Sequence, residues 1–202
     1  MYCPTVQRAI NILINAGIKT NIHYVLSKDT VEEAVERLAA HSFPDQINAI
    51  VFLLHKPVGL GKVWNVITRR HEPFHDLIRM VDSGNTGYKI GFDSCTVPAL
   101  VNFSRDISRD SLDTCEGGRW SAYISSDMKM MPCSFDNQDM HWAVDLRDHT
   151  IEEAWWSSEF EDFRAQFRNS CPDCLKRVVC MGGCPIRPEI VICDEKYNRN
   201  AI

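Results

Sequence analysis

The crowding of cysteines near the C-terminus constrains the fold of this chain more than any other feature. A C-x2-C-x5-C-x3-C run occupies fourteen positions, and one more cysteine follows it; the five residues are Cys171, Cys174, Cys180, Cys184 and Cys193. A C-x2-C turn directs two sulfur atoms into one site, and soft thiolate ligands select zinc or iron-sulfur clusters over metals that prefer oxygen. The run therefore predicts a metal centre.

Disulfide bonds are a weaker explanation of these thiols. The first four residues lack the basic patch and apolar run of a signal peptide, so we expect a reducing, cytoplasmic setting. The longest apolar stretches, such as residues 50–54, are far shorter than the roughly 20 residues that cross a bilayer, so no membrane contact is expected. A net charge of -5 without a basic run predicts no nucleic-acid binding.

The spacing leaves two kinds of metal centre open. Zinc sites are commonly built from paired C-x2-C elements, but the second pair is missing here. The x5 and x3 spacings resemble runs that hold iron-sulfur cubanes and reach a second cluster. Cys95, Cys115 and Cys133 raise the candidate thiols to eight, enough for two sites of four, whereas Cys3 is expected to be an ordinary small apolar residue.

Apolar periodicity in the first part of the chain predicts an α/β fold. Helices are expected over residues 4–16, 30–40 and 73–81, and strands over 18–26, 47–54 and 88–92. Thr30 and Glu33 match a capping box at the start of the second helix. The continuous apolar run at 47–54 suits a parallel strand covered on both faces, so residues 18–54 are expected to form a β-α-β unit.

Such a sheet of two or three strands has an unfinished, apolar edge. Either another chain covers that edge, or the polypeptide is a fragment whose missing strands came before Met1, which is the interpretation we favour. The segment 56–61 follows the second strand at the carboxyl edge, where α/β folds bind ligands. It is equally explained as a Gly/Pro turn.

The second part of the chain predicts different elements. Residues 120–124 and 129–133 are expected to pair as a hairpin, with a turn at 125–128. Thr150 and Glu153 form a second candidate capping box, for one helix that ends near Phe167.

The order of cysteines around this hairpin resembles the seven-cysteine signature of SPASM domains over about residues 88–202. Cys115, Met128 and Cys133 match its hairpin segment, and the C-terminal run and Cys193 match the rest. Residues 1–87 resemble the end of the radical S-adenosylmethionine barrel that precedes this domain. The resemblance implies a partial (incomplete) β/α barrel in residues 1–87, followed by a small α+β cysteine-rich SPASM domain in residues 88–202.

The resemblance also implies two auxiliary 4Fe-4S clusters with separate ligands. One would be held by Cys95, Cys115, Cys133 and Cys184, and the other by Cys171, Cys174, Cys180 and Cys193. Cys95 lies farther from Cys115 than the family's first ligand often does; without it, that cluster would keep an open iron.

Two further departures from the family pattern concern the hairpin. Met128 stands where the family has glycine, at a cost of about 1 kcal/mol if the turn needs a positive φ. Ser134 follows Cys133, where the sulfatase-maturing branch has a catalytic aspartate, so that specific chemistry is not expected.

The function implied by the resemblance is that of a radical enzyme of the peptide-modifying or enzyme-maturing type, with a peptide or protein substrate. The C-x3-C-x2-C motif that binds the cofactor-cleaving cluster is absent. S-adenosylmethionine and a third 4Fe-4S cluster are therefore expected only in a complete enzyme, and this chain alone should be inactive. The alternative is a non-catalytic module that binds zinc or clusters and recognises a partner.

Overall fold

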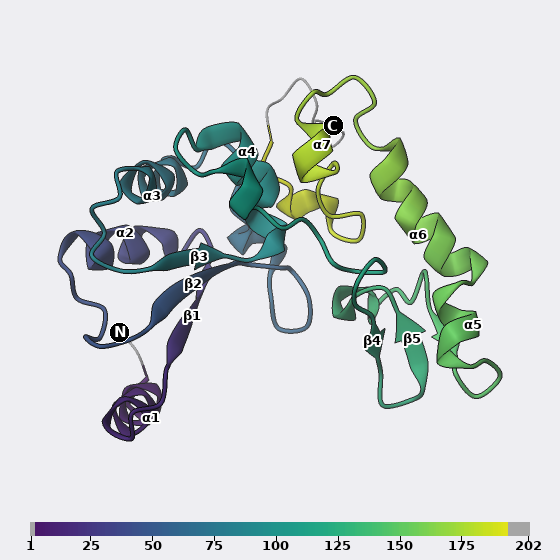
Figure 1. Ribbon diagram of the computed structural model, residues 1–202, viewed down its shortest axis with the longest axis horizontal. Helices are drawn as coiled ribbons and strands as arrows, with labels where there is room; N and C mark the ends of the chain where they lie inside the picture. The colour runs from purple at the N-terminus through teal and green to yellow at the C-terminus, as the bar shows by residue number, and fades with distance from the viewer. Residues whose placement is uncertain (1–2, 194–202) are drawn as a thin grey trace.

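Two three-stranded sheets organise the computed structural model, which describes residues 3–193 (Figure 1). The first sheet is parallel, with the order β1-β2-β3, and the second is antiparallel, with the order β4-β5-β6. Figure 1 shows helices α2 and α3 on one face of the first sheet, and α5 and α6 beside the hairpin of the second. The fold is therefore α/β with a parallel sheet.

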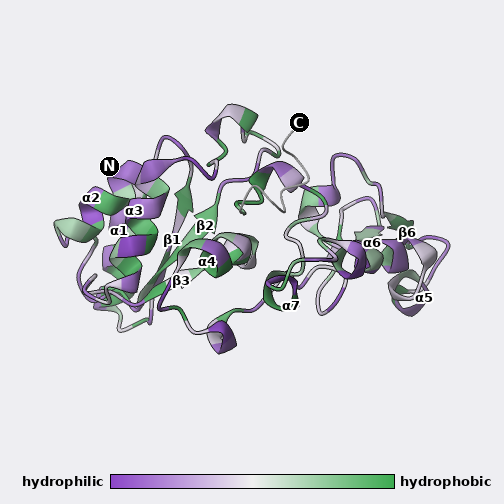
Figure 2. Cartoon of the chain, turned by 90° about the horizontal axis from the view of Figure 1, so that it is seen from above, coloured by the Kyte–Doolittle hydropathy of each residue, from purple (hydrophilic) through white to green (hydrophobic). Residues whose placement is uncertain are grey.

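The first sheet consists of β1 (Asn21–Leu26), β2 (Ala49–Leu54) and β3 (Ile90–Phe92). β1 and β2 pair in parallel, as the predicted β-α-β unit requires, and Phe52 lies opposite Phe92 of β3. Every second residue of β2 is buried and the others are half-buried, so one face of this strand is less covered than its apolar run predicts. Figure 2 shows the hydrophobic character of β2.

Three helices accompany this sheet: α1 (Pro4–Asn15), α2 (Val31–Ala39) and α3 (Glu72–Asp82). Their positions match the predicted helices, but the predicted capping box of α2 is wrong. Thr30 uses its hydroxyl to donate to the carbonyl of Val25 at 2.7 Å and to accept from the amide of Ser27 at 2.9 Å. Glu33 pairs with Arg37 at 2.8 Å instead. The turn after β1 thus occupies the hydroxyl that would have capped the helix.

The antiparallel sheet consists of β4 (Tyr123–Ile124), β5 (Lys129–Met131) and β6 (Val144–Asp145). The predicted hairpin is confirmed, with shorter strands. Met128 has a φ of 63° in its turn, the left-handed conformation that a glycine would adopt without strain.

The single helix predicted over residues 150–167 is wrong, because two helices occupy this segment. They are α5 (Ile151–Trp155) and α6 (Ser158–Asn169). The capping box of Thr150 and Glu153 is present at the start of α5. The hydroxyl of Ser157 then accepts a bond from the amide of Phe160 and caps a new helix.

Several elements had no counterpart in the prediction. These are β6, two helices and five 3-10 turns: α4 (Val97–Phe103), α7 (Arg177–Cys180), η1 (Val63–Asn65), η2 (Ser94–Thr96), η3 (Arg109–Ser111), η4 (Ser134–Asp136) and η5 (Pro188–Ile190). Three of them contain or directly follow a cysteine: α7 contains Cys180, η2 contains Cys95, and η4 follows Cys133.

The end of the described chain returns to the first sheet. Ile190 and Ile192 are buried in the same apolar cluster as Phe52 and Phe74. In Figure 1 this last segment, in yellow, lies between α4 and α6. Residues 171–193 therefore lie where the two parts of the molecule meet. Among residues 3–193, no helix is long and apolar enough to cross a membrane.

Candidate metal centres

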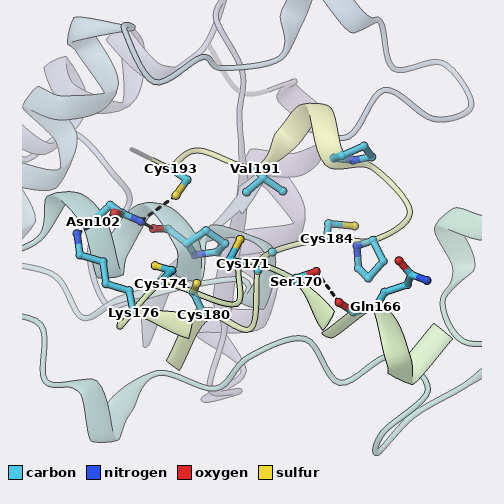
Figure 3. A pocket seen from close by; sticks show the side chains of 15 residues that line it. Asn102, Gln166, Ser170, Cys171, Cys174, Lys176, Cys180, Cys184, Val191 and Cys193 are labelled. Carbon is cyan, nitrogen blue, oxygen red and sulfur yellow. Dashed lines mark hydrogen bonds between the residues drawn. The ribbon is translucent and has the colours of Figure 1, made fainter. Parts of the chain in front are cut away.

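A small cavity of about 140 Å³ is lined by the cysteines of the C-terminal run and by Cys193 (Figure 3). In Figure 3 the side chains of Cys171, Cys174 and Cys180 lie close together, with Cys193 above them. Cys174 and Cys171 act electrostatically on the thiol of Cys180, which shows the same proximity. Four thiols from three separate turns thus converge on one space.

The backbone between Cys180 and Cys184 has positive φ values, and at two of its three positions the conformation and the close contacts favour glycine. Gly182 and Gly183 have φ values of +83° and +82°. A Cβ on Gly182 would lie 2.3 Å from Cβ of Ser170, and one on Gly183 would lie 2.7 Å from Cγ1 of Val191. These glycines therefore let the chain fold tightly against its neighbours while it presents cysteines on both sides.

Two polar side chains stand beside this cavity. Asn102 of α4 approaches Cys193 with its side-chain amide, with Nδ2 at 3.6 Å from Sγ. Lys176 donates to Oδ1 of the same asparagine at 2.8 Å. Sequence reasoning missed Asn102, because its helix is short and nothing in the spacing connects it with a cysteine 91 positions later.

The other predicted ligands lie near one another at a second place. Cys184 and Cys115 both act electrostatically on the thiol of Cys95, and Cys115 and Cys133 act on that of Cys184. A Cβ on Gly117 would lie 3.5 Å both from Sγ of Cys115 and from Cβ of Cys133. Cys95, Cys115, Cys133 and Cys184 are thus brought together from distant parts of the sequence.

Cys184 lies between the two groups of thiols, but its sulfur belongs with those of Cys95, Cys115 and Cys133. It lines the cavity of the C-terminal run. Figure 3 shows its sulfur pointing away from those of Cys171, Cys174 and Cys180. The backbone amide of Arg187 donates to this sulfur at 3.3 Å.

Burial governs the protonation of these thiols. It raises the pKa of Cys95, Cys115 and Cys180, and it raises that of Cys184 to about 11. Without a cation these buried side chains are therefore neutral thiols at pH 7. A bound metal supplies the positive charge that lets such thiols ionise, so the donor set fits a thiolate-bound metal or cluster.

The described residues contain no group of three or more His, Cys, Asp or Glu side chains already spaced to hold one metal ion. The ligand sets therefore stay predictions that rest on proximity and chemistry. Cys3 is exposed at the start of α1, which Figure 1 shows far from α6 and α7.

A buried ion pair near Cys95 was also missed. Lys56, two residues after the end of β2, pairs with Asp93, which directly follows β3. The rest of segment 56–61 forms a tight turn, in which the amide of Gly61 donates to the carbonyl of Val58 at 2.8 Å. The alternative that this segment binds a ligand is untested.

A comparison with protein families identifies the segment that contains the hairpin and the start of the C-terminal cysteine run. The family model of the SPASM domain, an iron-sulfur cluster-binding domain, matches residues 115–175. The chain carries a SPASM domain. The matched segment contains Cys115, Cys133, Cys171 and Cys174, half of the predicted ligands.

The fold has a counterpart among solved structures. The crystal structure of SuiB from Streptococcus suis, bound to S-adenosylmethionine, matches with a TM-score of 0.57 and 15% identity, over 91% of this chain and 46% of that one. At this identity the likeness shows the fold alone, and this chain spans about half the length of its counterpart. No curated protein matches the sequence. The SPASM domain and this fold bear out the resemblance predicted from the cysteine pattern.

Proposed function

We propose that the chain is the C-terminal part of a radical S-adenosylmethionine enzyme whose SPASM domain holds two auxiliary 4Fe-4S clusters. Cys95, Cys115, Cys133 and Cys184 hold the first cluster. Cys171, Cys174, Cys180 and Cys193 hold the second. The enzyme is of the peptide-modifying or enzyme-maturing type, and its substrate is a peptide or protein.

The observation that supports this proposal is that Cys180 and Cys184, two of the eight buried or half-buried thiols, have different cysteines as neighbours. The electrostatic neighbours of Cys180 are Cys174 and Cys171, whereas those of Cys184 are Cys115 and Cys133. Cys184 follows Cys180 by only four positions and yet belongs to the other group. A single zinc site would use four thiols and leave the other four without a purpose.

The first sheet supports the assignment of a partial barrel. Among the described residues, β1 is an edge strand, and Val25 in it is exposed. Further strands beside β1 would complete a barrel, and the C-x3-C-x2-C motif, a third cluster and S-adenosylmethionine would belong to that part. The likeness to a protein crystallised with S-adenosylmethionine supports this view.

The residues of this chain have a supporting role in such an enzyme. Bound clusters of this kind accept and donate single electrons. The chain holds them in buried thiol sites, with Asn102 beside the second site and the amide of Arg187 on a sulfur of the first. We place the enzyme in the cytoplasm, since cluster-ligating thiols survive best in a reducing compartment.

The test is the metal content of the chain after anaerobic reconstitution with iron and sulfide. Two cubanes predict about eight iron and about eight acid-labile sulfide per chain, and no cleavage of S-adenosylmethionine by this chain alone. The Cys3→Ser variant should give the same content. Zinc without sulfide would contradict the proposal and favour the non-catalytic module.

A further inference from the structure

The ion pair between Lys56 and Asp93 links the ends of two neighbouring parallel strands. Only 11% of the Lys56 side chain and 14% of the Asp93 side chain are exposed. The carboxylate is held in place by further donors, since it accepts from the hydroxyl of Thr96 at 2.7 Å and from the amide of Leu54 at 3.2 Å. The position of the lysine ammonium is therefore fixed.

The ammonium stands between two segments that carry predicted ligands of the first cluster. Asp93 directly precedes η2, in which Cys95 lies. On its other side, Nζ of Lys56 lies 5.4 Å from the ring centroid of Phe135, which follows Cys133 by two positions in η4. One fixed positive charge, the ammonium of Lys56, therefore lies close to the segment of Cys95 and to the segment of Cys133.

The two charges of the pair act on Cys95 in opposite directions. Lys56 favours a negative charge on its sulfur, and Asp93 opposes it. Both side chains are largely shielded from solvent, so salt and water screen their effect much less than at the surface. A cluster at this place would therefore experience the pair more strongly than it would a surface ion pair.

We propose that Lys56 sets the reduction potential of the cluster held by Cys95, Cys115, Cys133 and Cys184, and that Asp93 limits this effect. The inference rests on the proposed function. Gaining one electron makes a cluster more negative, and a nearby cation stabilises that state, so Lys56 raises the potential. Because the pair lies at the ends of β2 and β3, it would also link the position of these strand ends to the potential of the cluster.

A purely structural ion pair makes a different prediction. Substituting either partner would then break the same contact, and both variants should change the cluster in the same direction. An electrostatic role predicts opposite signs, because Lys56→Gln removes the positive charge, whereas Asp93→Asn leaves it uncompensated. Asparagine keeps one of the two oxygens, so it can still accept either from the hydroxyl of Thr96, which bonds Oδ1 of Asp93, or from the amide of Leu54, which bonds Oδ2.

The experiment is a redox titration of the anaerobically reconstituted full chain with dithionite, followed by electron paramagnetic resonance. Iron and sulfide are measured in each variant. We expect Lys56→Gln to lower the midpoint potential of one cluster and Asp93→Asn to raise that of the same cluster. Lys56→Arg, which keeps the charge, should stay close to the wild type. The second cluster is an internal control and should not move.

Lys62→Gln is the matched control, because it removes the same charge from an exposed position in the same loop. Two results would overturn the inference and leave the proposed function intact. One is an equal midpoint potential in all variants at full iron content. The other is a shift of the midpoint potential in the same direction in Lys56→Gln and in Asp93→Asn. If Lys56→Gln does not fold, the shift of Asp93→Asn decides. A wild-type chain that binds no iron would instead contradict the proposed function itself.

Discussion

The two parts of the molecule are held together by different means. The parallel sheet and its helices enclose an apolar core, in which the side chains of Leu26, Leu38, Phe52, Phe74 and Leu77 are fully buried. The strands around the cysteines are two or three residues long, and much of that chain runs in turns. Its smaller core centres on Met130, Val144, Ala154 and Phe160.

This difference indicates where the free energy of folding comes from. Burial of an aromatic or aliphatic side chain contributes about 1.5–3 kcal/mol, so the first part can be stable without a ligand. The cysteine segments bury fewer such side chains. The path of their backbone depends on the positions of cysteines and glycines instead. We infer that the first part folds on its own and that the second depends on its metal for order.

Removing the metal should produce the largest effect. Chelation of the reconstituted chain is expected to abolish the hydrogen-exchange protection of amides near the ligands, such as that of Cys174, while the amides of β2 stay protected. Unfolding of a metal-dependent region exposes its amides together. Equal protection of the apo and loaded chains around Cys174 would contradict the difference between the two parts.

A cavity in the apolar core should have a smaller effect than removal of the metal. It should lower the free energy of unfolding without affecting metal binding. Phe74 of α3 is fully buried in the apolar core between the helices and the first sheet. The Phe74→Ala variant is expected to lose about 3–5 kcal/mol of stability, measured by urea denaturation followed by circular dichroism. Iron content per folded chain should remain that of the wild type. Loss of iron from a variant that is still folded would show that the two parts are not separable in this way.

The glycine turn of the second site allows a finer test. Gly183→Ala combines a strained backbone, at about 1–2 kcal/mol, with a clash against Val191. Gly84 has a similar φ of +69° but nothing within 4 Å of its would-be Cβ, so Gly84→Ala is the matched control for strain alone. We expect only Gly183→Ala to lose iron from the second site. Equal iron loss in both variants would mean that the clash has no role.

The smallest predicted effect concerns a helix cap in the second part. The hydroxyl of Thr150 accepts a bond from the amide of Glu153 at 3.2 Å. Thr150→Ala should therefore lower the stability of the loaded chain by about 1 kcal/mol. Thermal denaturation measures this loss. An unchanged melting temperature would show that the capping box does not contribute to cooperative unfolding.

The sequence predicts those elements whose signal is local. The parallel β-α-β unit follows from apolar periodicity, and the hairpin follows from two short β-rich segments around a turn. Thr30 does not cap α2, because its hydroxyl bonds to Val25 of β1 and to Ser27 of the following turn. Both partners lie outside the local capping motif. The break between α5 and α6 was missed although Ser157 is a good capping residue, since Thr150 already explained the helix start.

Short elements and long-range pairs could not be predicted in this way. α7 spans only four residues and is determined by the cysteine and glycine turns around it. Lys56 and Asp93 are 37 positions apart, and their pairing requires that β2 and β3 are neighbours. The assignment of Cys184 and Cys180 to different clusters follows only from the family resemblance. The structure supports it through the direction of the sulfur, which no spacing encodes.

The central claim is that eight thiols divide into two independent sets of four. Its most direct test is the iron content, after anaerobic reconstitution, of Cys133→Ser, Cys174→Ser and the double variant. Each single variant should keep about four iron per chain and lose the signal of a different cluster, and the double variant should keep none. Loss of all iron from one single variant that remains folded, or of the same cluster from both, would contradict the account.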